Sequence, residues 1–294
     1  KEEVKKMDIL GKRRIWYAIS IAVLVIGLLF LAINGLNFGI DFQGGSLLEF
    51  RFDQEITNQE VRNVLQKINI APDAKIQQSD TQGIKGVLIR TQKLSPKQIS
   101  DIEEGLRNEY PSTDMLRSES VGAVIGQELR TKAILALLIA SVAIVLYISV
   151  RFEFRFAIVS IITLMHDVLI TIGIFAILGS EVNTPFVAAL LTIIGYSIND
   201  TIVIFDRIRE NMKMMHKTPF KELANQAVVD TLPRSINTSL TTLITILAIY
   251  LFGGASIKVF MLALFIGMFA GTYSSIFVAS PLLVTWTHRI TNKK

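Results

Sequence analysis

The chain has 294 residues, of which 51% are hydrophobic and 19% charged, and its mean hydropathy of +0.47 indicates an integral membrane protein. It has no cysteine, which excludes disulfides and thiolate metal sites and argues against redox chemistry. The net charge of +5 does not indicate nucleic-acid binding, because the basic residues cluster beside apolar runs, as in membrane proteins.

Six apolar runs are long enough to cross a bilayer as helices. They are residues 15–33, 133–150, 156–178, 186–205, 235–252 and 259–286. The last run is long for one straight crossing, and its Gly267, Gly271 and Pro281 allow a bend, close packing or a short interfacial helix. We therefore expect an α-helical integral membrane protein with six transmembrane helices.

Basic residues gather on one side of these runs. They occur in the tail 1–14, the hairpin 151–155, the loop 206–234 and the tail 287–294. The connections on the other side of the apolar runs have few basic residues, with none in 179–185 and one in 253–258. The positive-inside rule then predicts that both termini are cytoplasmic and that residues 34–132 lie outside.

Residues 34–132 are the stretch able to form a domain outside the membrane. Hydrophobic periodicity predicts strands at 46–52, 75–78, 86–91 and 115–121 and helices at 58–68 and 95–109. This order predicts a ferredoxin-like α+β domain, in which two helices cover one face of an antiparallel sheet. The segment lacks His and Cys and its acidic residues are scattered, so we expect no catalytic site in it.

Carboxylates inside two apolar runs are the strongest functional signal. Asp200 lies within 186–205, and Asp167 lies near the middle of 156–178 with His166 beside it. A charged carboxylate near the bilayer centre costs about 2.5 to 3.5 kcal/mol on insertion scales, so such residues usually face a bundle interior and serve ions or protons. Arg234, at the start of the fifth run, could approach Asp200 by reaching inward.

Other polar residues accompany Asp200 on the fourth run. Helical spacing places several of them on one face. The polar residues of this stretch are Tyr196, Ser197, Asn199 and Thr201. One side of this helix is therefore expected to be wet or hydrogen-bonded.

Each of these intramembrane groups also has a plainer interpretation. Asp200 could form a structural ion pair with Arg234, because buried membrane carboxylates are often satisfied by a partner. His166 could be an interior hydrogen-bonding group rather than a proton carrier, although its ordinary pKa suits that task. Asp167 could serve either purpose.

Two further motifs have structural interpretations. Asp206 and Arg207 stand at the end of a span, where charged anchors are common. The pair Gly44 and Gly45 could be a turn before the first strand of the external domain.

Four stretches in chain order together resemble the SecF side of the SecD/SecF family of bacterial protein-export subunits. The first is Gly39-Ile-Asp-Phe-Gln-Gly-Gly45, which contains Asp41, and the second is His166-Asp167. The third is Gly195-Tyr-Ser-Ile-Asn-Asp-Thr201 with Asp206-Arg-Ile-Arg-Glu-Asn211, and the fourth is Leu232-Pro-Arg-Ser235. The resemblance covers essentially the whole chain, including the six spans and the external domain after the first.

The resemblance implies half of a bundle of the resistance-nodulation-division type, paired with SecD beside the SecYEG channel in the bacterial inner membrane. It implies that a proton or sodium gradient drives external domains that pull preproteins, with no ATP, metal or other cofactor used by this subunit and no enzymatic activity. YajC and YidC are further implied candidates for partners. By position, Asp200 resembles the proton carrier and Arg234 its coupled cation, with Asp167 and His166 in the relay.

Three other classes of function are alternatives. An exporter of small molecules or lipids would share carboxylate-driven transport but usually has much larger external domains. An aspartyl intramembrane protease would also use two carboxylates, yet neither Asp167 nor Asp200 lies in a Tyr-Asp or Gly-x-Gly-Asp context. The sequence also has no Walker A loop and no His-Glu-x-x-His site, which argues against an ATPase or a metalloprotease. A purely structural scaffold remains an alternative, in which neutralising Asp200 would not affect export.

Overall fold

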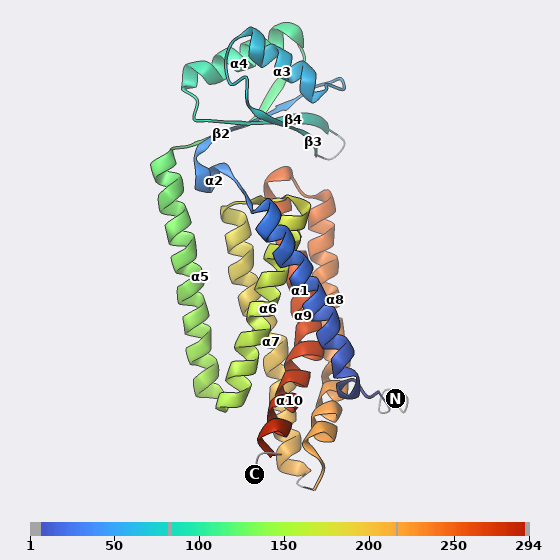
Figure 1. Ribbon diagram of the computed structural model, residues 1–294. Helices are drawn as coiled ribbons and strands as arrows, with labels where there is room; N and C mark the ends of the chain where they lie inside the picture. The colour runs from blue at the N-terminus through green and yellow to red at the C-terminus, as the bar shows by residue number, and fades with distance from the viewer. Residues whose placement is uncertain (1–6, 82–83, 216, 292–294) are drawn as a thin grey trace.

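A bundle of long helices carries a small α+β domain at one end, and both ends of the described chain lie at the opposite end (Figure 1). This computed structural model describes residues 7–81, 84–215 and 217–291. Within these residues, six helical segments are long and apolar enough to cross a membrane. The expected fold class, six apolar helices with an α+β domain after the first, is confirmed.

The bundle consists of long helices joined by short connections. Helices α7 and α8 continue well beyond their apolar runs, so most of residues 206–234 is helical. The helices are α1 (Arg13–Asn34), α5 (Ala123–Arg151), α6 (Phe154–Leu178), α7 (Thr184–Met214), α8 (Phe220–Phe252), α9 (Ala255–Ser274) and α10 (Ser280–Thr291), with a 3₁₀ turn at Leu10–Lys12 before α1.

The sixth crossing is interrupted by a π-helical segment, Ser275–Ala279, between α9 and α10. The change of hydrogen-bonding pattern follows Gly267 and Gly271 rather than occurring at them, and Pro281 falls in the first turn of α10, where its missing N–H costs little. Single-turn π segments are rare within helices and often occur at functional sites.

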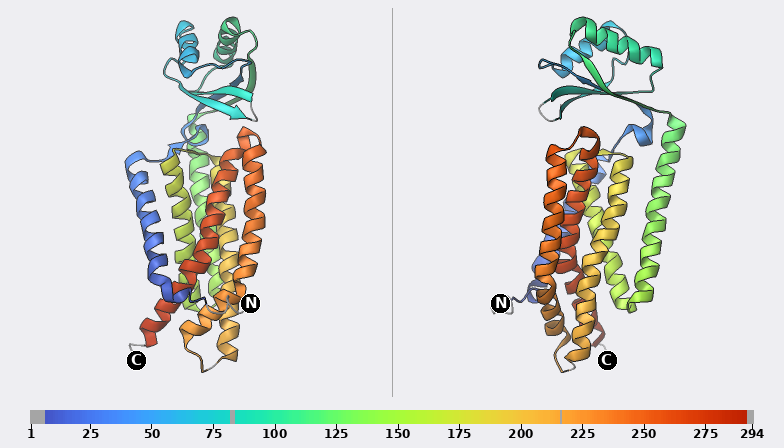
Figure 2. Two further views of the ribbon diagram at one scale, coloured as in Figure 1. Left: turned by 90° about the vertical axis from the view of Figure 1, so that its right-hand side faces the viewer. Right: turned by 180° about the vertical axis from the view of Figure 1, so that it is seen from behind.

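Helices α6, α7 and the sixth crossing form the centre of the bundle, because about half of each apolar window is buried. Helices α1 and α5 expose most of theirs and are therefore the ones most open to lipid or to another chain. Figure 2 shows α5 standing apart from the other helices along much of its length. The polar residues that matter to function are thus expected on α6, α7 and α9.

The external domain is a four-stranded antiparallel sheet with strand order β3-β4-β2-β5. Helices α3 and α4 cover the face that points away from the bundle (Figure 1). Both begin with capping boxes, Thr57 with Glu60 and Ser95 with Gln98, which satisfy the free N–H groups of the first turn. The elements are β2 (Gly45–Arg51), α3 (Asn58–Lys67), β3 (Lys75–Thr81), β4 (Ile84–Thr91), α4 (Pro96–Glu109) and β5 (Asp114–Val121).

Alternation along the strands divides the side chains of this sheet between two environments. Leu48 and Phe50 of β2 are fully buried in the apolar core formed with α3 and α4. Leu47 and Glu49 of the same strand point to the other face, toward the membrane bundle, where they line a cavity of about 190 Å³. The sheet therefore presents a partly charged surface to the bundle.

The pair Gly44 and Gly45 joins the external domain to the bundle after a short helix, α2 (Ile40–Gln43). Both glycines have positive φ, 76° and 134°, which other residues rarely adopt. A Cβ on Gly44 would stand 2.9 Å from the Cα of Ala123, and one on Gly45 would stand 2.5 Å from the carbonyl oxygen of Thr91. The glycines thus make the expected turn and also allow close approach of α5 and β4.

A second, very short sheet was not anticipated from the sequence. Strand β1 (Asn37–Phe38), after the first span, pairs in parallel with β6 (Glu181–Val182), in the connection between α6 and α7. Two-residue strands carry no detectable alternation, and their partners lie far apart in the chain. This sheet links the entrance of the external domain to the central helices.

Candidate functional site

Asp167 is the centre of a buried hydrogen-bond network in the middle of the bundle. Its side chain is fully buried on α6. The hydroxyls of Ser197 (2.5 Å) and Ser274 (2.8 Å) donate to its Oδ2 atom, and Nδ1 of His166 lies 2.8 Å from its Oδ1 atom. Three helices thereby hold this carboxyl group in one orientation.

Asp200 on α7 is also buried but is held much more loosely. In the described part of the chain it accepts one hydrogen bond, from the hydroxyl of Ser239 at 3.4 Å. Ser239 on α8 in turn accepts from Thr272 on α9 at 2.7 Å. A carboxyl group with one long hydrogen bond is freer to exchange a cation than one held by three short contacts, such as Asp167.

The two carboxylates belong to one polar layer that crosses the bundle. Ser197, which contacts Asp167, lies one turn before Asp200 on the same helix. Thr201, adjacent to Asp200, shares a hydrogen bond of 2.8 Å with Ser275, the first residue of the π segment. Movement of α7 would therefore alter contacts with α6, α8 and the sixth crossing together.

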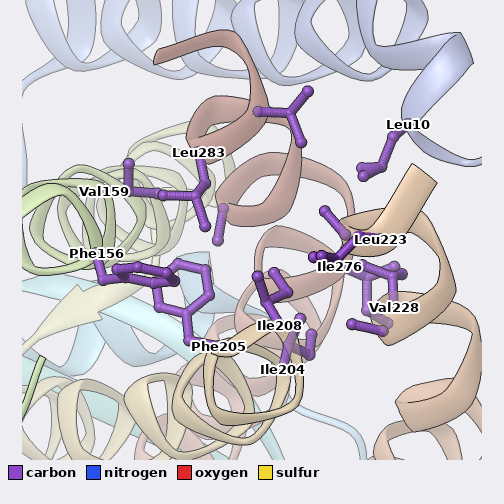
Figure 3. Close-up of a cluster of buried hydrophobic side chains, with 14 of the residues drawn as sticks. Leu10, Phe156, Val159, Ile204, Phe205, Ile208, Leu223, Val228, Ile276 and Leu283 are labelled. Atoms are coloured by element: carbon purple, nitrogen blue, oxygen red, sulfur yellow. The ribbon is translucent and has the colours of Figure 1, made fainter. Parts of the chain in front are cut away.

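Apolar clusters close this polar layer on both sides along the membrane normal. On the side of the chain ends, Ile204 and Ile276 belong to a cluster with Phe156 and Phe205 (Figure 3). On the side of the external domain, a second cluster includes Ile193 one turn before Ser197. Apolar layers of this kind are unfavourable for ions.

Arg234 does not contact Asp200. Its side chain is exposed at the part of α8 that precedes Ser239 by about 7.5 Å along the helix axis. Arg234 and Asp200, both within the described residues, form neither an ion pair nor a hydrogen bond, so the interpretation of a permanent structural pair does not describe this conformation.

The remaining predicted polar residues divide between interior and surface. His166 is buried, and its Nε2 atom has no hydrogen-bond partner within the part of the chain that the structure describes. The hydroxyl of Tyr196 is likewise buried and unpartnered among those residues. Asn199 is exposed on α7, so it faces outward instead of joining the network around Asp167.

Asp206 and Arg207 lie on α7 away from the polar layer. Asp206 approaches Arg151 (3.8 Å) and Arg209 (3.4 Å), and Arg207 binds Asp230 of α8 at 2.7 Å. The pairs with Arg151 and Asp230 join neighbouring helices at the bundle end that carries the chain termini, and the pair with Arg209 lies within α7. They position α7 relative to α5 and α8 and do not contact either buried carboxylate.

Asp41 and the glycine motif also lie away from the buried carboxylates. Asp41 belongs to α2 and accepts a hydrogen bond of 2.8 Å from the backbone N–H of Thr184, the first residue of α7. Gly39 donates its N–H to the carbonyl of Val182 at 2.9 Å. The motif therefore contacts the external end of the helix that carries Asp200.

The hydroxyl groups of the sixth crossing are functional candidates that the sequence reasoning missed. Thr272, Ser274 and Ser275 form a run of hydroxyl residues inside an otherwise apolar segment, which was the available signal. The run follows helical spacing poorly because the π segment shifts the register after Ser274. Ser274 donates to Asp167, and Thr272 and Ser275 contact Ser239 and Thr201 beside Asp200. These contacts become visible only in the packed bundle.

The polar layer contains groups that can bind a proton or a small cation. Within the described residues, no group of three or more His, Asp and Glu side chains could hold a metal ion. The buried groups are carboxyl, imidazole and hydroxyl groups in a layer sealed by apolar clusters. Such groups can take up, hold and release a small cation.

The sequence matches two families along most of its length. Residues 101–289 match the family described as protein export membrane protein SecD/SecF, C-terminal, and residues 29–56 match the SecD/SecF GG motif. The second match contains Asp41, Gly44 and Gly45, whose geometry is described above.

Curated relatives agree with these matches. The protein translocase subunit SecF of Thermobaculum terrenum is 41% identical, with 96% of this chain and 95% of the relative covered. The SecF subunit of Desulfurispirillum indicum is 43% identical over 92% of this chain and 89% of the relative. The protein translocase subunit SecDF of Thermus thermophilus is 41% identical over 92% of this chain, which spans 37% of that longer protein.

Solved structures show the same fold. A crystal structure of SecDF, a translocon-associated membrane protein from Thermus thermophilus, superposes with a TM-score of 0.89 at 38% identity, over 96% of this chain and 39% of that one. A crystal structure of SecDF in its super-membrane-facing form gives a TM-score of 0.72 at 38% identity, over 98% of this chain and 39% of that one. This chain belongs to the SecD/SecF family of protein-export membrane proteins, on the side of the SecF translocase subunits.

Proposed function

We propose that this subunit pairs with SecD and uses a proton or sodium gradient to promote the late stage of preprotein translocation through the SecYEG channel, with Asp200 as the ion carrier. The proposed location is the bacterial inner membrane with both termini in the cytoplasm, since the basic tails and loops lie at one end of the bundle. Preproteins are the proposed substrates, and YajC and YidC are proposed as further contacts.

The different surroundings of the two carboxylates support Asp200, rather than Asp167, as the ion carrier. Asp167 has three short contacts, whereas Asp200 has one contact of 3.4 Å. A carrier must bind and release its ion within each cycle, and each extra hydrogen bond to one protonation state opposes that exchange. In this proposal Asp167, with His166, holds α6, α7 and the sixth crossing in register while Asp200 exchanges the ion.

Arg234 is the proposed coupled cation. In this conformation it is exposed and lies about 7.5 Å along the axis of α8 from Ser239, the hydrogen-bonding partner of Asp200. Its approach would favour the ionised carboxylate and its retreat the protonated one, so their separation would control proton affinity. One elementary charge crossing about 100 mV provides about 2.3 kcal/mol, so a few ions per cycle suffice to move a domain.

The exposed polar faces of α7 and α8 support the pairing with SecD. The exposed polar or small residues of each helix are spaced three or four apart, as expected for one helical face. Such residues favour contact with another helix over contact with lipid. They are Thr192, Gly195 and Asn199 on α7 and Arg234, Asn237, Thr241 and Thr245 on α8. The similarity to the SecDF of Thermus thermophilus, of which this chain covers 37%, supports a SecD half as the partner.

The decisive experiment reconstitutes the subunit with SecD and the SecYEG channel and measures late-stage translocation under an imposed proton or sodium gradient. Asp200→Asn should assemble with SecD but lose gradient-dependent stimulation. The matched control is Asp53→Asn, an exposed carboxylate of the external domain, which should retain it. Normal stimulation by assembled Asp200→Asn would favour a structural scaffold instead.

Arg234→Met tests the coupling separately. Removing the cation should change the pH dependence of stimulation, because Asp200 loses the group that adjusts its proton affinity. If the response to the gradient and to pH stays unchanged, Arg234 has a structural purpose only. Repeating the series with each gradient identifies the coupling ion.

A further inference from the structure

Charged side chains cover the face of the external sheet that points toward the bundle. Strand alternation directs Glu49, Arg90, Arg117 and Glu119 to this face, and all four line the same cavity of about 190 Å³. Glu181, in the connection between α6 and α7, lines it from the bundle side. The sheet thus meets the bundle through charged side chains as well as apolar ones such as Leu47 and Leu88.

The ion pair between Arg90 and Glu181 crosses this boundary. A guanidinium nitrogen of Arg90 on β4 contacts a carboxylate oxygen of Glu181 on β6. Their side chains are 20% and 11% exposed, in contrast to the Arg51 and Asp114 pair in the same sheet, which is 38% and 53% exposed. A desolvated ion pair is screened little by solvent, so it resists displacement more than a surface pair does.

Backbone pairing and a helix cap continue the connection from Glu181 to α7. Asn37 and Phe38 pair in parallel with Glu181 and Val182. The carboxylate of Asp41 accepts from the N–H of Thr184 at 2.8 Å, where the partial positive charge of a helix N-terminus favours an anion.

Helix α7 is continuous from Thr184 to Met214, so its external end and Asp200 belong to one rigid element. The distance between Thr184 and Asp200 along the axis is about 24 Å. A shift or tilt of α7 caused by ion exchange at Asp200 therefore appears at Thr184. There the hydrogen bond to Asp41 joins α7 to the segment that leads into the external domain.

We propose that Asp41, Arg90 and Glu181 form a mechanical clasp that transmits the movement of α7 to the external sheet. The inference rests on the proposed function, since it assumes that ion exchange at Asp200 moves α7. These three residues are coupling residues and bind neither the ion nor the preprotein. Without the clasp, the ion would still be exchanged in the membrane, but the external domain would no longer follow.

The test measures ion uptake and export on the same reconstituted complex of this subunit with SecD and SecYEG. Arg90→Met and Asp41→Ala, which removes the acceptor of the Thr184 N–H, should assemble and keep gradient-driven ion uptake into proteoliposomes. Their gradient-dependent stimulation of export should fall by about 5-fold or more, the lower end of typical coupling between sites. Arg51→Met, which breaks the exposed pair in the same sheet, is the matched control and should affect neither measurement.

The combinations of results separate this inference from the proposed function. Loss of uptake in Asp200→Asn with loss of export alone in the clasp variants supports both. Normal uptake and export in Asp200→Asn overturns the proposed function whatever the clasp variants do. Normal export in assembled Arg90→Met and Asp41→Ala, or loss of uptake together with export, overturns the clasp.

A crosslink provides a second test, because the chain contains no cysteine. Arg90→Cys/Glu181→Cys should lose export stimulation, and bridging the two thiols with a flexible bis-maleimide should restore it. Capping the same thiols singly with N-ethylmaleimide is the control and should not restore it. Equal activity of bridged and singly capped protein would overturn the mechanical interpretation.

Discussion

Gly173 of α6 lies against Gly27 of α1 so closely that a Cβ added to Gly173 would stand 2.8 Å from the Cα of Gly27. Small residues of this kind let two membrane helices approach backbone to backbone. The contact ties the exposed helix α1 to the central helix α6, which carries Asp167.

Gly173→Ala should therefore destabilise the bundle, although alanine is the better helix former. Separating two packed helices typically costs about 1 to 3 kcal/mol through overpacking. The control is Gly195→Ala on α7, where nothing lies within 4 Å of the added Cβ, so stability should stay equal or rise. Thermal unfolding in detergent measures both, and equal midpoints for the two variants would contradict the packing.

Asp167→Ala should destabilise the isolated chain more than Asp200→Ala. The first substitution leaves His166 and Ser197 without their acceptor, whereas Ser274 keeps the carbonyl of Gly271. Each unpaired buried group costs about 1 to 3 kcal/mol. The second removes one long hydrogen bond. Thermal unfolding in detergent provides the comparison, and an equal or larger loss for Asp200→Ala would show that Asp167 is not the structural centre of the polar layer.

Gly45→Ala should disrupt the junction between the external sheet and the bundle. The new Cβ would stand 2.5 Å from the carbonyl of Thr91, in addition to the strain of a positive φ. Gly35→Ala isolates the second effect, because Gly35 also has a positive φ of 66° but no atom within 4 Å of the added Cβ. That strain alone is about 1 to 3 kcal/mol.

Hydrogen exchange of β2 and β4 reports the result. Faster exchange in Gly45→Ala than in Gly35→Ala is expected, because the steric clash acts on the sheet itself. Equal exchange in the two variants would mean that Thr91 moves away at little cost.

Burial raises the pKa of Glu181, although Arg90 opposes the rise; Asp41 adds to it and Arg117 opposes it more weakly. Lys258 lines the same part of the surface. The folded protein thus holds this proton more tightly than the unfolded chain does, so lowering the pH stabilises the fold at this position. Wild type should gain stability relative to Glu181→Gln as the pH falls from about 7 to about 4.

Glu60→Gln is a control of opposite sign. The backbone N–H and hydroxyl of Thr57 lower the pKa of Glu60, so its contribution is present at neutral pH and is lost as the pH falls through that lowered value. Wild type should therefore lose stability relative to Glu60→Gln over the same range. Thermal midpoints against pH measure both, and parallel slopes would contradict the assigned environments.

The hydropathy pattern was sufficient to predict the membrane spans and the external domain. Capping residues such as Thr57 and Ser95 mark helix starts by local chemistry, and strand alternation around Leu48 and Phe50 identifies the buried face of the sheet. These features depend on residues that are neighbours in the chain, so they can be predicted from the sequence without a structure. The short strands β1 and β6 and the helix α2 were not, because two to four residues carry no periodic signal.

The two intramembrane carboxylates were likewise evident in the sequence, since a charged group within an apolar run is costly wherever it points. The sequence did not show that Asp167 has three short contacts whereas Asp200 has one long hydrogen bond. Ser274 and Ser275 reach Asp167 and Thr201 across the bundle, and Arg234 stays at the surface, because side-chain partners depend on helix rotation and on the π segment.

The order of residues alone therefore determined that this protein crosses the membrane six times, carries one α+β domain and buries two acidic groups, because hydrophobicity and local hydrogen bonding act over a few residues. The packing of the helices decided which acid is held firmly, which is held by a single contact, and how the sheet is joined to α7. Those choices depend on distances between residues more than a hundred positions apart, such as Asp41 and Thr184, and such distances exist only in the folded chain.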